Sequence, residues 1–204
     1  MRRALRLLVA GALTLLTVGL AAHSPSAQPA DDSDAAIDSY LATFSGPRVG
    51  PTYIYPDPKL TPGLVNPDIT QATIDQTICN PQWSTKSIRP PVSYTNNLKT
   101  KQLAGGAATD KNPSHYEEDH FISLEIGGHP TDPRNLWPEP WGTPAQPLTS
   151  KGPFPSHLVG AKTKDAVENQ LHKEVCAGTL TLRQAQEIIA TDWFKYYRDH
   201  VLKP

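Results

Sequence analysis

The sequence predicts an α+β fold in which a short β-hairpin in the middle of the chain is accompanied by several helices. Two stretches, 115–126 and 135–141, stand on either side of a double glycine and a polar loop, which is the pattern of a hairpin. Apolar residues recur every three or four positions between residues 161 and 193, which predicts helices there. Pro and Gly crowd residues 46–67, so we expect an extended segment rather than a helix.

The first element is predicted to be a signal peptide over residues 1–27. Arg2, Arg3 and Arg6 precede an apolar run over residues 7–22, and small residues follow it. The run is shorter than the roughly 20 residues that cross a bilayer comfortably. We therefore expect a secreted or periplasmic protein with no stable membrane insertion once the leader is removed; a retained membrane anchor is the alternative.

The remainder is predicted to be one domain, residues 46–204, preceded by a flexible segment, 28–45, that is rich in Ala, Ser, Pro and Asp. Loss of the leader with its three arginines takes the formal net charge from −1 to −4. A negative chain argues against a nucleic acid partner unless basic groups gather locally. The sequence gives no indication of the oligomeric state.

The chain has two cysteines, Cys79 and Cys176, and export places them where a disulfide persists. We expect them to be bonded to each other, which would tie the middle of the chain to the end of a late helix. Two buried free thiols are the alternative. The absence of a CxxC pair argues against a structural zinc site.

Two elements are predicted before the hairpin. Ile69 and Ile74 belong to a short periodic piece that fits a helical turn or a strand equally well, and this choice stays open. A helix is then expected, with Ser93 or Thr95 as its N-cap and the double glycine at 105–106 as its end.

Two helices are predicted after the hairpin, beyond a Pro/Gly-rich loop over residues 142–160. Apolar residues spaced four apart define the first of them. These residues are Val167, Leu171 and Val175. The second helix is predicted to begin with a capping box formed by Thr181 and Gln184.

The hairpin carries the residues that suit chemistry on a phosphodiester. Hydrolysis of that bond needs an activated water and a divalent cation on a rigid scaffold. The sequence YEEDHFISLEIGG places Asp119 and His120 on the first strand, and Asn135 opens the second strand. Glu117 and Glu118 flank the pair, and strict alternation puts Glu118 on the same face as His120.

This arrangement resembles the HNH, or His-Me finger, endonuclease motif. More closely, EEDHFISLEIGGHPTDPRNLWPEPW resembles small exported HNH-like bacterial proteins of largely uncharacterised function, and a wider resemblance, from RPPVSYT through KDAVENQLHKEVCAG, covers roughly half of the chain. It implies a ββα-metal core of hairpin and helix, a metal-dependent nuclease and a DNA and/or RNA substrate. By resemblance, Asp119 is a metal ligand, His120 is the general base, and Asn135 fixes the hairpin loop and orients His120.

The helix departs from the family pattern, because no CHxxK string is present. Asp165, Glu168 and His172 share one sector of the predicted helix and are the candidates to complete the metal site. The carboxylates favour Mg²⁺ or Mn²⁺, whereas His172 suits Zn²⁺ or Ni²⁺. Arg89 and Lys164 are the candidates for binding phosphate.

Two further functions compete with the nuclease. A non-catalytic exported module of the same ββα fold, which binds metal or a cell-surface partner, is favoured by the negative charge and the missing helix ligand. A metallohydrolase acting on another phosphoester or on a peptide is the third, because a site alone does not define its substrate.

Overall fold

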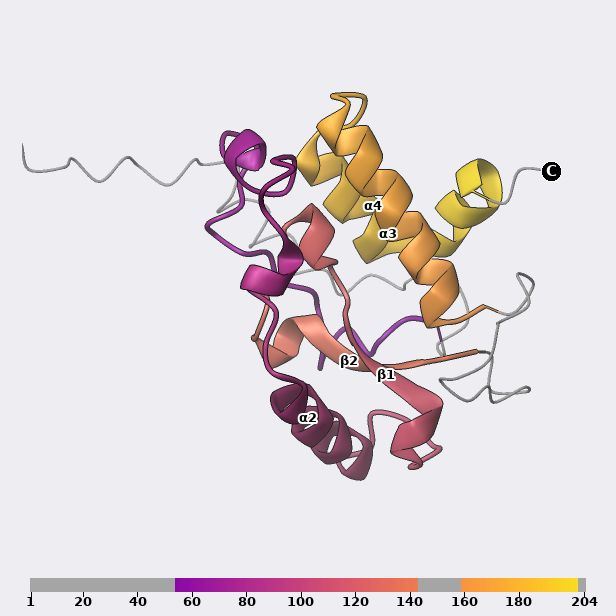
Figure 1. The fold of residues 1–204 in the computed structure, drawn as a ribbon. Coiled ribbons are helices and arrows are strands. Elements are labelled where there is room, and N and C mark those ends of the chain that lie inside the picture. The colour runs from indigo at the N-terminus through magenta and orange to yellow at the C-terminus, as the bar shows by residue number, and fades with distance from the viewer. Residues whose placement is uncertain (1–53, 143–158, 202–204) are drawn as a thin grey trace, which may run out of the picture.

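The computed structural model describes residues 54–142 and 159–201 of the chain. In this part, the structure contains three α-helices and one two-stranded antiparallel sheet, which confirms the predicted α+β class. The helices are α2 (Val92–Ala104), α3 (Ala161–Cys176) and α4 (Leu182–Tyr196), and the strands are β1 (Tyr116–His120) and β2 (Leu136–Pro140). Figure 1 shows α2 on one side of the hairpin, with α3 and α4 on the other. The predicted leader, the segment 28–45 and most of the loop 142–160 lie outside the described residues.

The described part of the Pro-rich segment, residues 54–67, contains no helix. It runs beside the hairpin and its loop, with an isolated bridge between Val65 and Gly128 and further bonds such as that from the Asn66 amide to the Gly127 carbonyl (2.7 Å). Its first residues are anchored to α4, because the Trp193 indole donates a hydrogen bond of 3.2 Å to the Ile54 carbonyl. The segment around Ile69 and Ile74, for which the sequence fits a helical turn or a strand equally well, forms turns. They include a 3₁₀ turn over Ile74–Gln76, and Ile69 is buried.

Helix α2 begins differently from the prediction. Neither Ser93 nor Thr95 caps it; the N-cap position belongs to Pro91, which makes no side-chain cap bond. The Thr95 hydroxyl instead donates to the Val92 carbonyl at 3.1 Å. Proline starts the helix because its ring fixes φ near the helical value, here −58°. The predicted end is confirmed: Gly105 follows the last helical residue.

Strand β1 is shorter than predicted. It stops at His120 rather than Ile126, because Ser123 caps a 3₁₀ turn over Leu124–Ile126 by accepting a bond from the Glu125 amide. In β2, Pro138 lies opposite Glu118 and does not end the strand. Antiparallel pairs alternate between bonded and non-bonded positions, so prolines two residues apart can both avoid the ladder bonds.

Helices α3 and α4 follow the predicted pattern. The apolar residues predicted for α3 are fully buried, and the capping box of Thr181 and Gln184 is present at the start of α4. Helix α4 bends at Asp192, which has non-helical angles (φ −152°, ψ 65°). The Asp192 carboxylate accepts bonds from the Tyr55 hydroxyl (3.0 Å) and the Lys195 amide (2.9 Å), so the break is stabilised by contacts. Within the described ranges, none of the helices has the length and apolar character needed to cross a membrane.

The predicted disulfide is confirmed: Cys79 and Cys176 are bonded, with their Cα atoms 5.3 Å apart and with a separation of 97 positions in sequence. The bond joins the end of α3 to the turns that precede α2. It therefore closes a loop that contains α2, the hairpin and α3.

Reduction of this disulfide is expected to lower the melting temperature by about 5–15 °C, because a cross-link over a loop of this length contributes about 2–4 kcal/mol. The measurement is thermal unfolding with and without reductant. The double variant Cys79→Ser/Cys176→Ser is the control and should be insensitive to reductant. Equal melting temperatures for the unmodified protein under both conditions would contradict the prediction.

Candidate functional site

Asn135 fixes the loop between the two strands. Its side chain is fully buried, and its Oδ1 accepts bonds from the amides of Ile122 (2.9 Å) and Leu64 (3.3 Å). Its Nδ2 donates to the carbonyls of Ile122 (3.0 Å) and His129 (2.9 Å). All four bonds go to backbone, so one amide side chain holds both ends of the loop and the Pro-rich segment together.

Steric constraints explain why both positions before the loop, 127 and 128, are glycine. Gly127 has a φ of +79°, a conformation that residues with a side chain rarely adopt. A Cβ on Gly128 would stand 1.7 Å from the Ile122 carbonyl oxygen, which no shift of a side chain can relieve. The turn therefore needs glycine at both positions if Asn135 is to reach both ends of the loop.

The alternation of β1 sends its acidic residues to two faces of the hairpin. Asp119 points toward α3, where the Lys164 ammonium meets it, and Glu117 shares its face. Glu139 lies directly opposite Glu117 in the register and therefore joins this face. Glu118 and His120 occupy the other face, as the alternation predicted.

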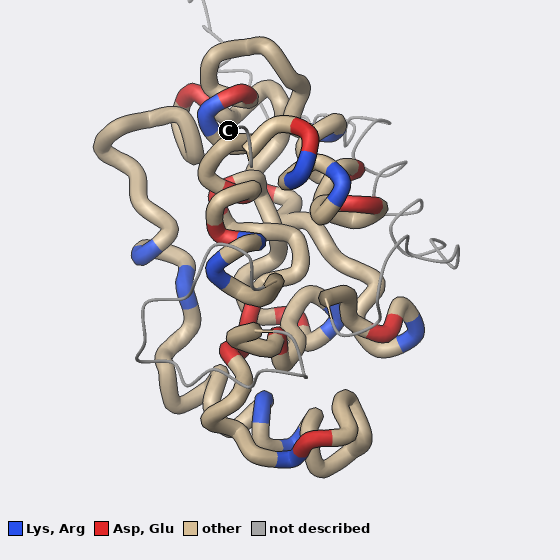
Figure 2. The backbone as a smooth tube through the Cα atoms, turned by 90° about the vertical axis from the view of Figure 1, so that its right-hand side faces the viewer, with Lys and Arg blue, Asp and Glu red and all other residues tan. Residues whose placement is uncertain are grey.

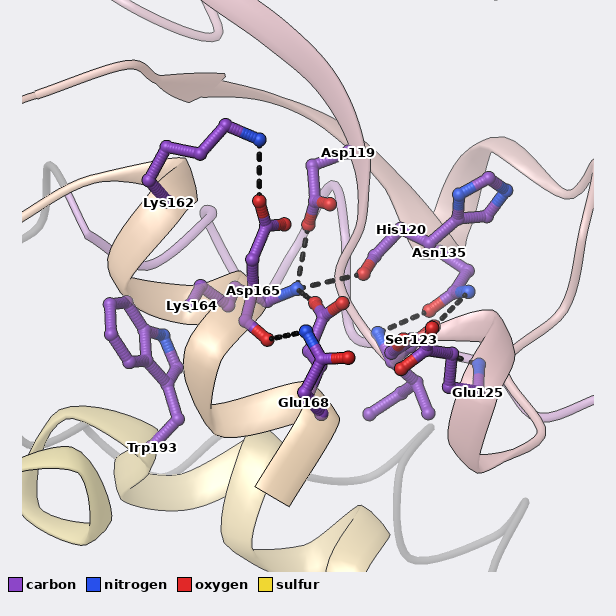
Figure 3. Close-up of polar contacts among 12 residues, drawn as sticks. Asp119, His120, Ser123, Glu125, Asn135, Lys162, Lys164, Asp165, Glu168 and Trp193 are labelled. Atoms are coloured by element: carbon purple, nitrogen blue, oxygen red, sulfur yellow. Dashed lines mark hydrogen bonds and ion pairs between the residues drawn. The ribbon is translucent and has the colours of Figure 1, made fainter. Parts of the chain in front are cut away.

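Lys164 is the centre of the face toward α3. Its side chain is fully buried, and its Nζ donates to Asp119 Oδ2 (2.7 Å), to the His120 carbonyl (3.0 Å) and to Glu168. Figure 3 shows Asp119 and Glu168 converging on this ammonium group. Burial alone would lower the pKa of Lys164, but the carboxylates of Asp119 and Glu168 raise it well above its usual range. The ammonium group is therefore charged.

The acids around Lys164 outnumber it. Burial raises the pKa of Glu168 to about 7, with the nearby ammonium acting in the opposite direction. Burial also raises the pKa of Glu139 well above its usual range, and the charge of Asp119 adds to this effect. Glu139 is 1% exposed, and neither of its carboxyl oxygens has a hydrogen-bond partner among the described residues. Burial and the charge of Asp119 therefore favour the neutral form of Glu139, and no described donor contacts its oxygens.

The chemistry of this cluster fits a hard divalent cation, but its present arrangement does not. Carboxylate oxygens are the ligands that Mg²⁺ and Mn²⁺ prefer, and Asp119, Glu139 and Glu168 all lie near enough to Lys164 for their charges to raise its pKa. Within residues 54–142 and 159–201, however, no three His, Cys, Asp or Glu side chains are placed to hold a metal ion as they stand. The ammonium of Lys164 takes the central position.

His120 lies on the opposite face, and Figure 3 shows its ring pointing away from Lys164. Its Nε2 is 2.8 Å from the Pro130 carbonyl oxygen. A carbonyl only accepts, so Nε2 carries the proton and Nδ1 of the neutral ring is a free base. Burial lowers the pKa of His120, which keeps the ring neutral near pH 7. The residue is 4% exposed.

The other predicted site residues lie in three different places. Arg89 is exposed, and its positive charge is close enough to His120 to lower the pKa of that ring further. Asp165 pairs with Lys162 at 2.6 Å on the surface of α3. His172 is not part of the cluster: its Nε2 donates to the Ile78 carbonyl at 2.7 Å, beside the disulfide.

Two expectations need correction. Lys164 was expected to contact phosphate, but its ammonium is buried among carboxylates and faces no open surface. His172 was expected to share a site with Glu168, but it is turned toward the segment before α2 and lines a small pocket with Trp83 and Glu125. The reasons differ: the first turn of α3 lies against β1 and buries Lys164, whereas His172 lies two turns later, where α3 meets the segment that the disulfide joins to it.

Glu139 is the residue of the cluster that sequence reasoning missed. The signal was available, since a hairpin that pairs Asp119 with Trp137 also pairs Glu117 with Glu139. The register was not predicted, and without it the partner of Glu117 has no assigned face.

No protein-family model, curated protein or solved structure matches the chain. A function for it is therefore argued from the residues and contacts described above.

Asn135→Ala is expected to lower the free energy of unfolding by at least about 3 kcal/mol, because it leaves buried backbone amides and carbonyls without partners. Chemical denaturation measures the change. Asn97→Ala, at an exposed position of α2, is the matched control and should change stability by less than about 1 kcal/mol. Similar losses in the two variants would show that the loop does not depend on Asn135.

Glu118 gives the protein a dependence on pH. Burial raises the pKa of Glu118 to about 8 from an ordinary value of 4.5, and the charge of Asp119 contributes. Between these two values the unfolded chain releases this proton while the folded chain keeps it, so stability falls as pH rises. Glu118→Gln removes the titrating carboxyl group and therefore this loss of stability at higher pH.

The stability of Glu118→Gln relative to the unmodified protein is therefore expected to rise by about 3 kcal/mol between pH 5 and pH 8. Denaturant unfolding at both pH values tests this. Glu187→Gln, which alters a surface pair with Arg183, should show no such change. A stability difference for Glu118→Gln that is constant across the range would mean that Glu118 is ionised in the folded protein.

Proposed function

We propose that the chain is an exported, metal-dependent nuclease with an HNH-like ββα-metal core, which hydrolyses phosphodiester bonds of DNA and/or RNA. His120 is the general base, Asp119 is a metal ligand, and Asn135 holds the loop that carries the partner of His120. The observation that carries the proposal is the state of the His120 ring, which is neutral and held in a single tautomer by the Pro130 carbonyl.

This state is the one that a general base needs. The bond from Nε2 fixes the ring plane and leaves Nδ1 with a lone pair that can accept the proton of a water. Asn135 supports this geometry indirectly, because it binds the His129 carbonyl, one residue before Pro130. The four bonds of Asn135 thus keep the acceptor of His120 in place.

A bound divalent cation would neutralise charge on the phosphate and on the leaving oxygen. Asp119, with Glu139 and Glu168 beside it, is the donor set that this chain offers. Asp165 is a weaker candidate because it lies on the exposed surface of α3, where it pairs with Lys162, and not among the buried acids. The oxygen set favours Mg²⁺ or Mn²⁺ over Zn²⁺ or Ni²⁺.

Contact with the phosphate backbone is assigned to Arg89, an exposed residue whose charge acts on His120. A guanidinium there would place a phosphate near the base. In Figure 2 the Lys and Arg positions of the described segments are interspersed with Asp and Glu rather than gathered in one stripe. The proposed substrate contact is therefore local.

Export is supported by the disulfide, because such bonds persist in oxidising compartments and are rare in the cytosol. The Cys79–Cys176 bond fits a secreted or periplasmic protein, in agreement with the signal peptide that the first residues predict.

A second candidate function is a non-catalytic exported module of the same fold. It is favoured by the burial of His120, which is 4% exposed, and by the Lys164 ammonium, which already neutralises the acids that would hold a cation. Such a module would bind a cell-surface partner through another surface and would have no need of an accessible base.

Cleavage of plasmid DNA and of RNA by the purified protein, with Mg²⁺ or Mn²⁺ and with EDTA, separates the two functions. We expect cation-dependent cleavage that falls by about 10²–10⁴-fold in His120→Ala, because the base is lost. His200→Ala, at an exposed histidine after α4, is the matched control and should retain activity.

Folded, disulfide-bonded protein that cleaves neither polymer with Mg²⁺ or with Mn²⁺ would favour the non-catalytic module. Cleavage that survives in His120→Ala would keep the nuclease but remove His120 as its base.

A further inference from the structure

Lys164 is a buried ammonium group surrounded by acceptors rather than a solvated surface lysine. It lies in the first turn of α3, is fully buried, and directs its three donors to Asp119, Glu168 and the His120 carbonyl. These partners come from β1 and from α3 itself, so the ammonium fills the space between the strand and the helix. The side chain of Lys162, two residues earlier, is 53% exposed; it pairs with the surface residue Asp165 and lies over the Trp141 ring.

Three carboxyl groups lie around this one ammonium group. Asp119, Glu139 and Glu168 all act on the charge of Lys164, and neither oxygen of Glu139 accepts a bond from a donor in the described structure although the residue is 1% exposed. A buried carboxyl group without partners is costly, because nothing replaces the water that it has lost. Asp119 and Glu168 are bound by the lysine, whereas Glu139 is the carboxyl group of the cluster that the ammonium does not contact.

We propose that Lys164 is the internal counter-ion of a divalent-cation site, and that a cation binds Asp119, Glu139 and Glu168 only by displacing the Lys164 ammonium. This rests on the metal dependence proposed above. The site exists in two states: in one, the lysine holds α3 to β1; in the other, the cation takes its place and the lysine turns out toward solvent. The competition makes cation binding weaker than the three carboxylates alone would give.

A variant that removes the competitor tests the exchange. Lys164→Ala is expected to bind Mn²⁺ at least about tenfold more tightly than the unmodified protein in calorimetric titration, equivalent to roughly 1.4 kcal/mol. Adding Asp119→Asn to Lys164→Ala should abolish the gain, and Lys162→Ala should leave affinity unchanged. Folded Lys164→Ala with no gain in affinity, or a gain that survives Asp119→Asn, would overturn the proposal.

A second measurement uses the unmodified protein, in case Lys164→Ala does not fold. Amine acetylation followed by mass spectrometry reports how accessible each lysine is. Without divalent cation, Lys164 should react far more slowly than Lys162; with saturating Mg²⁺, its rate should rise by about tenfold while that of Lys162 stays constant. Lys164 that stays protected when the cation is bound would overturn the displacement.

The two readouts separate this inference from the nuclease. Cation-dependent cleavage with Lys164 still protected would keep the nuclease and overturn the displacement. Exposure of Lys164 by Mg²⁺ without cleavage of DNA or RNA would support the displacement and count against the nuclease.

Discussion

The buried ammonium of Lys164 is the contact on which the arrangement of the site depends. It joins the first turn of α3 to the last residues of β1 through Asp119 and the His120 carbonyl, and Glu168 one turn later on α3 completes the contact. A buried pair of this kind contributes little net stability compared with apolar packing, but removal of one partner leaves a charge unpaired and is strongly destabilising. It therefore sets the position of α3 more than it strengthens the fold.

Most of the fold could be predicted from local patterns. The four-residue spacing of apolar positions in α3, the capping box at Thr181 and the paired cysteines are short-range or compositional signals, and the structure contains all three. The predictions of where α2 starts and where β1 ends were wrong, because Pro91 and the turn begun by Ser123 compete with the expected signals over only a few residues. Element ends are decided by such small local differences.

The candidate site was less predictable than the fold. Asp119, His120 and Asn135 were found because they lie close together in sequence, around one hairpin. The roles of Lys164 and Glu139 depend on strand register and on how deeply α3 packs, and no local pattern encodes either quantity. A lysine among helical polar residues is usually solvated, so its burial becomes visible only in three dimensions.

The disulfide also bears on how the protein matures. The chain has only two cysteines, so no wrong intramolecular pairing exists, and oxidation needs no later reshuffling by an isomerase. The two thiols are distant in sequence and meet only when the end of α3 has packed against the turns around Ile78. His172 of α3 contacts the same turns through its bond to the Ile78 carbonyl. The disulfide therefore forms after the hairpin and α3 have assembled. A chain that fails to assemble them would keep two free thiols, which can form disulfides with other molecules.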